Sequence, residues 1–394
     1  MRRRWKGLIV IFAALVLFFA GRGLVRARER RLERQMKIQP LIQLKLAPLA
    51  FGRFVIDLPE GVRLVNWSQT FQGTGPIRVA KGGTPEQFKQ TVEQRAEELR
   101  TQRHEDGGPL LEKVVDLGLP HAQALTYWKD EWELKTTFIE CDAFYLKNGS
   151  IYRFKNTIDL DPADQKEYFH DFKQMLQAIQ PRRPEEIPTL SGSCFDDAIL
   201  LDGPDRDFSD IVMVTGVWPD RPDVRFQLVV MDNGPFPDPQ LLDRLARANA
   251  LHGSGVLRSR DRNIGPIPGQ EHLERVEEKN GTQGHLFIWE AQGEANQWRS
   301  PQIRVEMTTG EGQHAPQDTS LSDEDALTLW DKILDSLRWR PSSNPPPFFG
   351  GGRKRSPDSG SPDQPAPSYY VPPPPRPDPF TFTLQLPPRP LPKN

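Results

Sequence analysis

A proline-rich stretch near the middle of this 394-residue chain is the feature that most constrains its fold. Residues 181–194 read PRRPEEIPTLSGSC, with prolines at Pro181, Pro184 and Pro188. Proline lacks an amide donor and holds the residue before it extended, so a helix that reaches this stretch must end there. A single core seldom grows beyond roughly 250–300 residues. We therefore predict a hinge over 185–193, between a first domain at 48–184 and a second at 194–341.

The first half carries the signals of strands and two helices. Phe54, Ile56 and Leu58 alternate with residues of the opposite face, which predicts a strand over 51–59. Thr84 before Pro85 is a typical helix start, and a helix is expected to about residue 103. Further strands are expected around 114 and at 122–128, 134–146 and 151–156, the last two joined by an Asn-Gly hairpin turn, with a closing helix at 162–179.

The second half repeats this order of elements. Strands are expected at 194–201, 211–217, 224–231, 284–289 and 302–307, and helices from Pro239 and from Ser322. Mixed strands with a mid-domain helix and a terminal helix indicate an α+β domain, an antiparallel sheet plus helices, used twice.

The charge is distributed in three zones. The net charge of −2 combines +9 over residues 1–37, +3 over 341–394 and therefore −14 over 38–340. An acidic globular body argues against nucleic acid as a partner, and it fits either simple solubility or a basic protein surface.

The N-terminus predicts a membrane anchor over residues 1–25. An uncharged apolar run from Leu8 through Ile11, Leu15 and Phe18 follows four basic residues, and no small-residue cleavage site comes after it. Residues 26–47 mix Arg and Glu, which indicates a solvated basic linker helix.

The C-terminal tail, residues 342–394, is of a different composition. With Pro341 it holds 18 of the 39 prolines, which predicts an extended, disordered segment. It is either a linker-like tail or a polyproline ligand for a partner domain.

No constellation for catalysis, metal or cofactor is found in the sequence. The seven histidines include no pair three or four residues apart, and neither a Gly-x-Ser-x-Gly turn nor a phosphate loop is present. Cys141 and Cys194 permit one disulfide or two free thiols, and the sequence leaves both open. We predict a protein that is not an enzyme and needs no cofactor.

Four residues are candidates for partner binding. Trp218 and Trp298 stand in turn-rich surroundings, where aromatic side chains anchor interfaces or cap the core of their own domain. Asp205 and Asp207 belong to an acidic cluster whose spacing does not fit a calcium loop, and acidic loop residues explain it better.

Taken together, these features resemble one family, the two-domain lipase immunity proteins of the bacterial type VI secretion system. The resemblance rests on the membrane-targeting N-terminus, the strand GRFVIDLP from Gly52, the restart CFDDAIL from Cys194, and the paired α+β layout over about 48–340.

The resemblance implies a periplasmic protein that grips a phospholipase toxin effector between two domains arranged as a claw. The apolar N-terminal run departs from this family pattern and predicts that an uncleaved segment holds the protein at the inner membrane. An alternative is an envelope adaptor, anchored in the membrane, whose proline-rich tail recruits a partner. A third class, an unrecognised hydrolase that uses Asp and His from both halves, would need turnover to support it.

Overall fold

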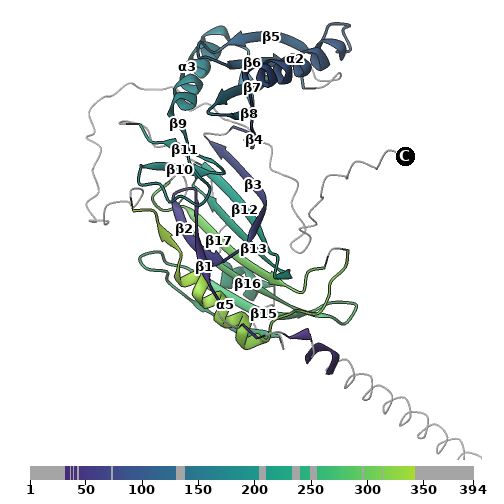
Figure 1. The fold of residues 1–394 in the computed structure, drawn as a ribbon, viewed down its shortest axis with the longest axis vertical. Coiled ribbons are helices and arrows are strands. Elements are labelled where there is room, and N and C mark those ends of the chain that lie inside the picture. Colours follow the sequence, from purple (N-terminus) through teal and green to yellow (C-terminus); the bar gives the residue numbers. More distant parts are fainter. Residues whose placement is uncertain are drawn as a thin grey trace, which may run out of the picture. The chain divides into compact units, whose positions relative to one another are not determined.

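The computed structural model describes residues 32–35, 37–38, 40–41, 44–71, 74–129, 138–203, 210–232, 240–248, 255–294, 297–312 and 314–341 (Figure 1). These residues form mostly antiparallel sheets with few helices, and every pairing between the described strands is antiparallel. The predicted anchor residues Leu8, Ile11, Leu15 and Phe18 lie outside them, as does the tail at 342–394. None of the described helices is both long enough and apolar enough to cross a membrane.

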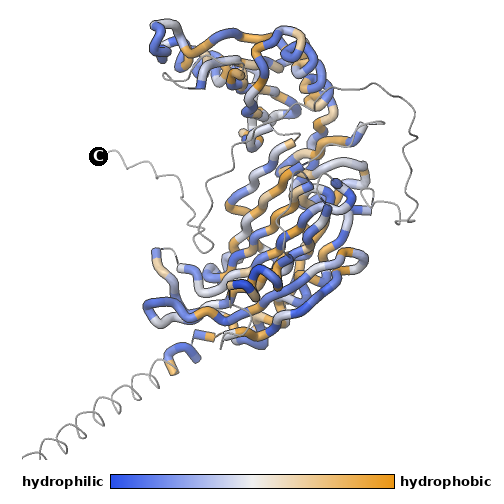
Figure 2. Tube along the Cα trace, turned by 180° about the vertical axis from the view of Figure 1, so that it is seen from behind, coloured by the Kyte–Doolittle hydropathy of each residue, from blue (hydrophilic) through white to orange (hydrophobic). Residues whose placement is uncertain are grey.

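The largest sheet has seven strands in the order β14-β15-β16-β17-β13-β12-β3. Its strand β3 comes from the first half of the chain and pairs with β12 of the second half. Figure 2 shows hydrophilic and hydrophobic residues alternating along these strands, as expected for a sheet with one buried face. The strands are β3 (Arg63–Phe71), β12 (Asp210–Trp218), β13 (Arg221–Met231), β14 (Val256–Asp261), β15 (Gln270–Glu277), β16 (Gln283–Ala291) and β17 (Gln302–Thr309).

The second sheet has five strands in the order β4-β8-β7-β6-β5, and it packs with helices α2 and α3. Asn148 and Gly149 join β7 to β8 with φ angles of 50° and 78°, the conformation that a tight hairpin turn needs, so the predicted hairpin is confirmed. The elements are β4 (Arg78–Lys81), α2 (Pro85–Thr101), β5 (Leu111–Asp116), β6 (Ala122–Tyr127), β7 (Phe138–Lys147), β8 (Ser150–Asp159) and α3 (Pro162–Ala178).

Two small sheets complete the described fold. One has the order β1-β2-β18 and the other β10-β11-β9. The predicted single strand at 194–201 is wrong: it is a hairpin, because Asp196 adopts a φ of 36° and turns the chain. The strands are β1 (Leu46–Phe51), β2 (Phe54–Pro59), β9 (Ile179–Pro181), β10 (Gly192–Phe195), β11 (Ala198–Leu201) and β18 (Arg338–Trp339).

Two of the predicted helices begin at the capping residues that the sequence shows. In α2, Thr84 and Gln87 form a reciprocal capping box around Pro85, and the apolar stripe from Phe88 to Leu99 is buried. Ser322 caps α5 (Asp323–Asp335). The helix expected from Pro239 is the short α4 (Leu241–Arg247).

Two main cores lie under these sheets. One contains α2, α3 and the five-stranded sheet, and the other contains α5, the seven-stranded sheet and strands β1 and β2. Trp67 on β3 packs against both. The two halves therefore do not repeat as separate sheets, because β2 and β3 contribute to the core of the second half.

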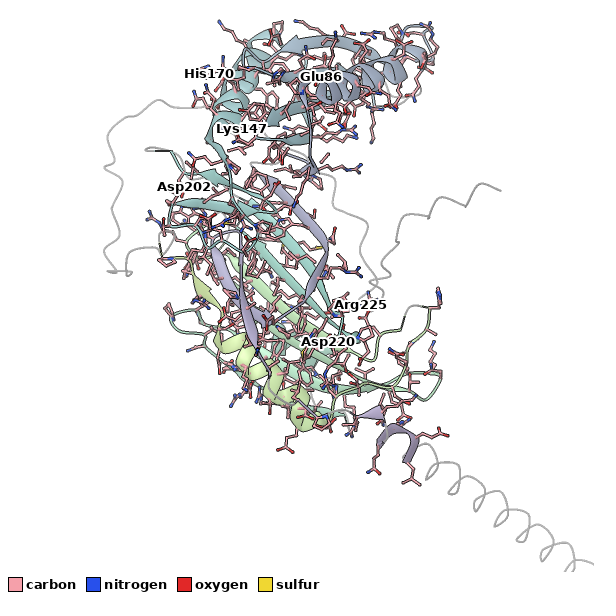
Figure 3. The ribbon with its side chains drawn as sticks, in the orientation of Figure 1. Glu86, Lys147, His170, Asp202, Asp220 and Arg225 are labelled. Carbon is pink, nitrogen blue, oxygen red and sulfur yellow. The ribbon has the colours of Figure 1, made fainter. Side chains whose placement is uncertain are left out.

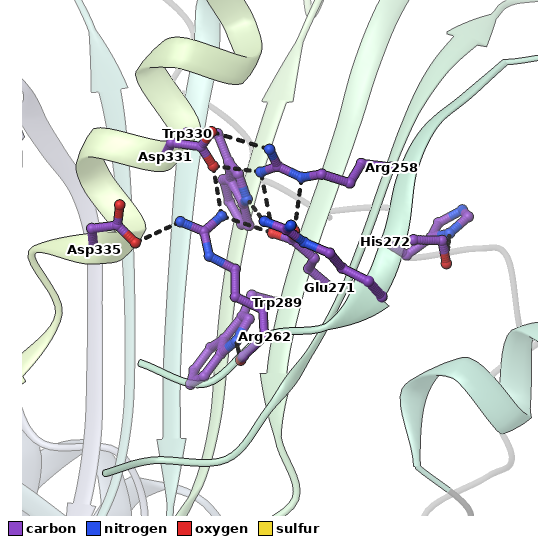
Figure 4. Close-up of polar contacts among 10 residues, drawn as sticks. Arg258, Arg262, Glu271, His272, Trp289, Trp330, Asp331 and Asp335 are labelled. Carbon is purple, nitrogen blue, oxygen red and sulfur yellow. Dashed lines mark hydrogen bonds and ion pairs between the residues drawn. The ribbon is translucent and has the colours of Figure 1, made fainter. Parts of the chain in front are cut away.

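A dense ionic network fastens α5 to the β14–β15 end of the seven-stranded sheet (Figure 4). Glu271 on β15 is fully buried and accepts hydrogen bonds from Arg260 and Arg262, each at 2.8 Å, and from the indole of Trp330 at 3.2 Å. Asp331 on α5 accepts a further bond of 2.6 Å from Arg262. Burial would raise the pKa of Glu271, but these bonds from Arg262, Arg260 and Trp330 outweigh it and lower the pKa.

Candidate interaction site at the β3 edge

The predicted hinge is a braced junction. Pro181 ends β9, and the guanidinium of the buried Arg182 donates to the carbonyls of Pro184 and Glu186, each at 3.0 Å. Arg340, which follows the last described strand, is fully buried and donates to the carbonyl of Pro188 at 3.0 Å. Its bonds to the carbonyls of Leu190 and Gly192 extend this contact. Backbone carbonyls held this way fix the path of the stretch.

A third buried arginine ties the opening hairpin to the same junction. Arg53 donates to both carboxylate oxygens of Asp202 at 2.7 Å, a two-point ion pair (Figure 3 labels Asp202). Arg53 also lies over the ring of Trp298, 4.5 Å from its centroid.

Two buried carboxylates stand next to this ion pair at the β3 end of the seven-stranded sheet. Asp210 accepts hydrogen bonds from Ser193 and, at 3.3 Å, from Gln69 of β3. Its amide donates to Asp232 at 2.9 Å. Burial, and then repulsion from Asp210, raise the pKa of Asp232 to about 7, and burial likewise raises the pKa of Asp210.

The predicted partner-binding residues have different surroundings. Trp218 is 7% exposed and belongs to the core of the second half, which favours the alternative that it caps its own domain. Trp298 is half-buried, and its ring meets that of Trp339 edge-on at 6.4 Å. Asp205 and Asp207 lie outside the described residues.

A cavity of about 380 Å³ opens beside β3. Strand β3 pairs only with β12 among the described strands, so its other edge is free of a strand partner (Figure 1). Leu64 and Val65 on this strand are 36% and 49% exposed. The cavity is lined by Leu64, Val65, Asn66, Trp67, Gln69, Ile77, Arg78, Val79, Phe195 and Asp196.

A second cavity of about 280 Å³ shares Arg78 and Val79 with the first. Arg95 and Arg153 also line it, and the fully buried Asp142 pairs with both, at 3.0 and 2.5 Å. Arg78 stands directly across from Arg153 in the β4–β8 pairing, and like charges at such positions repel. Among the described residues none forms an ion pair with Arg78. Glu98 also lines this cavity and pairs with Arg95 at 3.2 Å, so the positive charge of the shared wall is that of Arg78.

The described residues include no group of three or more His, Cys, Asp or Glu side chains that could hold a metal ion. Cys141 and Cys194 are both free and buried, in different hydrophobic clusters, and burial raises the pKa of each thiol. The site therefore offers an apolar strand edge and arginines, which suit binding.

Sequence reasoning missed strand β3 and the residues of this site. Val65, Trp67, Gln69 and Phe71 alternate along 63–71, and this pattern could have predicted a strand. Nothing in the pattern could have shown that the strand lies at the edge of a sheet built by the other half of the chain.

Two sequence profiles of one family match the chain. The profile of the Tle cognate immunity protein 4 N-terminal domain matches residues 47–187, and that of the C-terminal domain matches residues 186–342. No curated protein matches the chain.

Solved structures agree with these profiles. The apo immunity protein TplEi of the type VI secretion system from Pseudomonas aeruginosa is 28% identical, with a TM-score of 0.65 over 76% of this chain and 98% of that one. A Tle4–Tli4 complex contains a chain that is 26% identical, with the same TM-score and coverage. TplEi complexed with an "L" peptide is 25% identical, with a TM-score of 0.61 over 75% of this chain and 98% of that one.

Proposed function

Because the chain belongs to the Tle cognate immunity protein 4 family, we propose that it is an immunity protein, which binds and inhibits a phospholipase effector of a type VI secretion system. One observation carries this conclusion: the profiles of both domains match in order and together span residues 47–342. The chain that it resembles in the Tle4–Tli4 complex is covered over 98% of its length. Inhibition of the effector would protect the producing cell from its own toxin.

The proposed mode of inhibition is a grip on the effector between two domains, as in a claw, so that phospholipid cannot reach the effector's active site. The braced junction supports this mode, because Arg182 and Arg340 would hold the hinge at Pro181, Pro184 and Pro188 in one path. A fixed opening lowers the entropy lost on binding. We keep four residues as proposed contacts with the effector: Trp218, Trp298, Asp205 and Asp207. Of the two that the structure describes, Trp298 is half-buried and Trp218 is buried.

The protein would act without catalysis and in the periplasm, where a phospholipase toxin meets its membrane substrate. An uncleaved segment over residues 1–25 would hold it at the inner membrane, with residues 26–47 as a linker. The described part of that linker contacts the second half of the chain, because Arg34 and Lys37 form ion pairs with Asp318 at 3.1 and 3.5 Å.

The test follows phospholipid hydrolysis by the phospholipase encoded beside this gene, against increasing concentrations of the full-length chain. We expect hydrolysis to stop near one-to-one stoichiometry, with a complex on a sizing column. An unrelated phospholipase is the control, because inhibition of both enzymes would mean that the chain masks lipid. Undiminished hydrolysis at large excess, with no complex, would contradict the proposal.

Deletion of residues 342–394 separates this function from that of an envelope adaptor. The proline-rich composition of this tail favours the adaptor as a second candidate. An inhibitor should keep full inhibition without the tail, whereas an adaptor should lose its function.

A further inference from the structure

We infer that the free edge of β3 binds an extended segment of the effector as an added strand, and that an acidic side chain of this segment pairs with the arginines across β4. This inference rests on the proposed function, and it names the surface and the chemistry of the effector segment that fits it. It also differs from a general grip between domains, because it depends on backbone hydrogen bonds at one strand.

The first step is the backbone of β3. The amide of Ile77 donates to the carbonyl of Gln69 at 2.8 Å from the side of β3 that faces away from β12. In an antiparallel strand, alternate residues direct their N–H and C=O groups to the same side. The backbone N–H and C=O groups of Trp67 therefore point to the free edge. The hydrogen bond from Ile77 occupies this edge at Gln69. An extended segment can pair with such an edge.

The second step is the side chains around that edge. An exposed apolar edge strand is usually blunted by charge or covered. On β3, Leu64 and Val65 are exposed next to the partly buried Trp67, and together they line the 380 Å³ cavity. These side chains fit apolar residues of a bound segment, which would cover them.

The third step is charge, which selects the segment. Arg78 lines both cavities and faces Arg153 across β4–β8, while the carboxylate of Asp142 already pairs with Arg153 and Arg95. One more carboxylate at this place would relieve the repulsion and complete the pairing of Arg78. The segment that fits is thus extended, apolar, and acidic where it crosses β4.

Two variants of the full-length chain test this inference, each with a matched control on strand β5. Val65→Lys puts a charge on the free edge, and Val114→Lys puts the same charge on a valine that is 42% exposed on β5. Arg78→Glu reverses the charge of the cavity wall, and Lys113→Glu reverses an exposed charge on β5. We expect Val65→Lys and Arg78→Glu each to weaken binding of the effector at least about tenfold. The two control variants on β5 should leave binding unchanged.

Amide hydrogen exchange of the unaltered chain provides a readout that does not depend on any variant. Saturation with effector should slow exchange in peptides that cover 63–71 and should leave those that cover 111–116 unchanged. Backbone hydrogen bonds to an added strand should protect most strongly the amides on the free side of β3, such as that of Trp67. Unchanged exchange at 63–71 in the inhibited complex, or full binding by Val65→Lys and Arg78→Glu, would overturn this inference and leave the proposed function intact. Failure of the unaltered chain to bind or inhibit would overturn the proposed function itself.

Discussion

The two ends of the seven-stranded sheet differ in how much of their surface the chain itself covers. At the β14–β15 end, the buried Glu271 is surrounded by arginines, and helix α5 covers the sheet. At the other end, β3 exposes Leu64 and Val65 beside a cavity. At one end, ion pairs within the chain neutralise the buried charge and hold the covering helix. At the other end, apolar side chains and unpaired backbone groups are available to a partner. A sheet of one chain can thus be stabilised by its own side chains at one end and leave apolar side chains exposed at the other.

The pKa values of buried acids at these two ends are shifted in opposite directions. The pKa of Glu271 is lowered, because hydrogen bonds from Arg262, Arg260 and Trp330 outweigh its burial. The pKa of Asp232 is raised to about 7 by burial and by Asp210, with Arg53 acting in the opposite sense. The closed end therefore favours the ionised acid, and the β3 end favours the protonated acid.

The largest effect is expected from Glu271→Gln. This change keeps the volume but removes the charge that Arg258, Arg260 and Arg262 share, so the free energy of unfolding should fall by about 3–5 kcal/mol. Equilibrium denaturation measures the loss. Glu277→Gln, at an exposed position on the same strand, is the control and should stay within about 0.5 kcal/mol of the unaltered chain. A loss for Glu271→Gln as small as that of the control would show that the network does not stabilise α5 on the sheet.

A smaller effect is expected from pH at the β3 end. Folding holds a proton on Asp232 that the unfolded chain releases above a pKa of about 3.9, so stability should fall as pH rises towards 7. Glu271 contributes the opposite slope, but only as pH falls through its lowered pKa, below this window. The free energy of unfolding measured from pH 5 to pH 8 should therefore decline, and Asp232→Asn should remove the part of the decline that Asp232 contributes. A smaller decline should remain, because burial also raises the pKa of Asp210.

The control for this measurement is Asp220→Asn, at an exposed acid in the turn between β12 and β13, which Figure 3 labels. It should keep the decline of the unaltered chain. An Asp232→Asn variant that is as sensitive to pH as the unaltered chain would place the titrating group elsewhere.

The smallest effect on stability is expected from Val65→Lys. Because Val65 is 49% exposed, a lysine there can stay in water, and the free energy of unfolding should change by no more than about 0.5 kcal/mol. Thermal unfolding of this variant beside Val114→Lys measures it. A Val65→Lys variant that is clearly less stable than Val114→Lys would mean that the β3 edge is packed by the chain itself, and the contrast between the two ends would fail.

The amino-acid sequence alone indicated two helix starts, one hairpin and the family. Capping residues indicated the start of α2 and α5, and Asn148 with Gly149 indicated a hairpin. The strand GRFVIDLP and the restart from Cys194 indicated immunity proteins of the type VI secretion system. These signals are local, since caps and turns depend on residues a few positions apart.

The limits of the sheets follow from contacts between residues far apart in the chain. Three features depend on residues far apart in the chain. They are the pairing of β3 with β12, the burial of Trp218, and the contacts of Arg182 and Arg340 with the proline-rich stretch. The pattern of one strand states which face is apolar, but it does not state which strand lies beside it. The free edge of β3 is therefore a property of the folded chain, because an edge exists only once the other strands have paired.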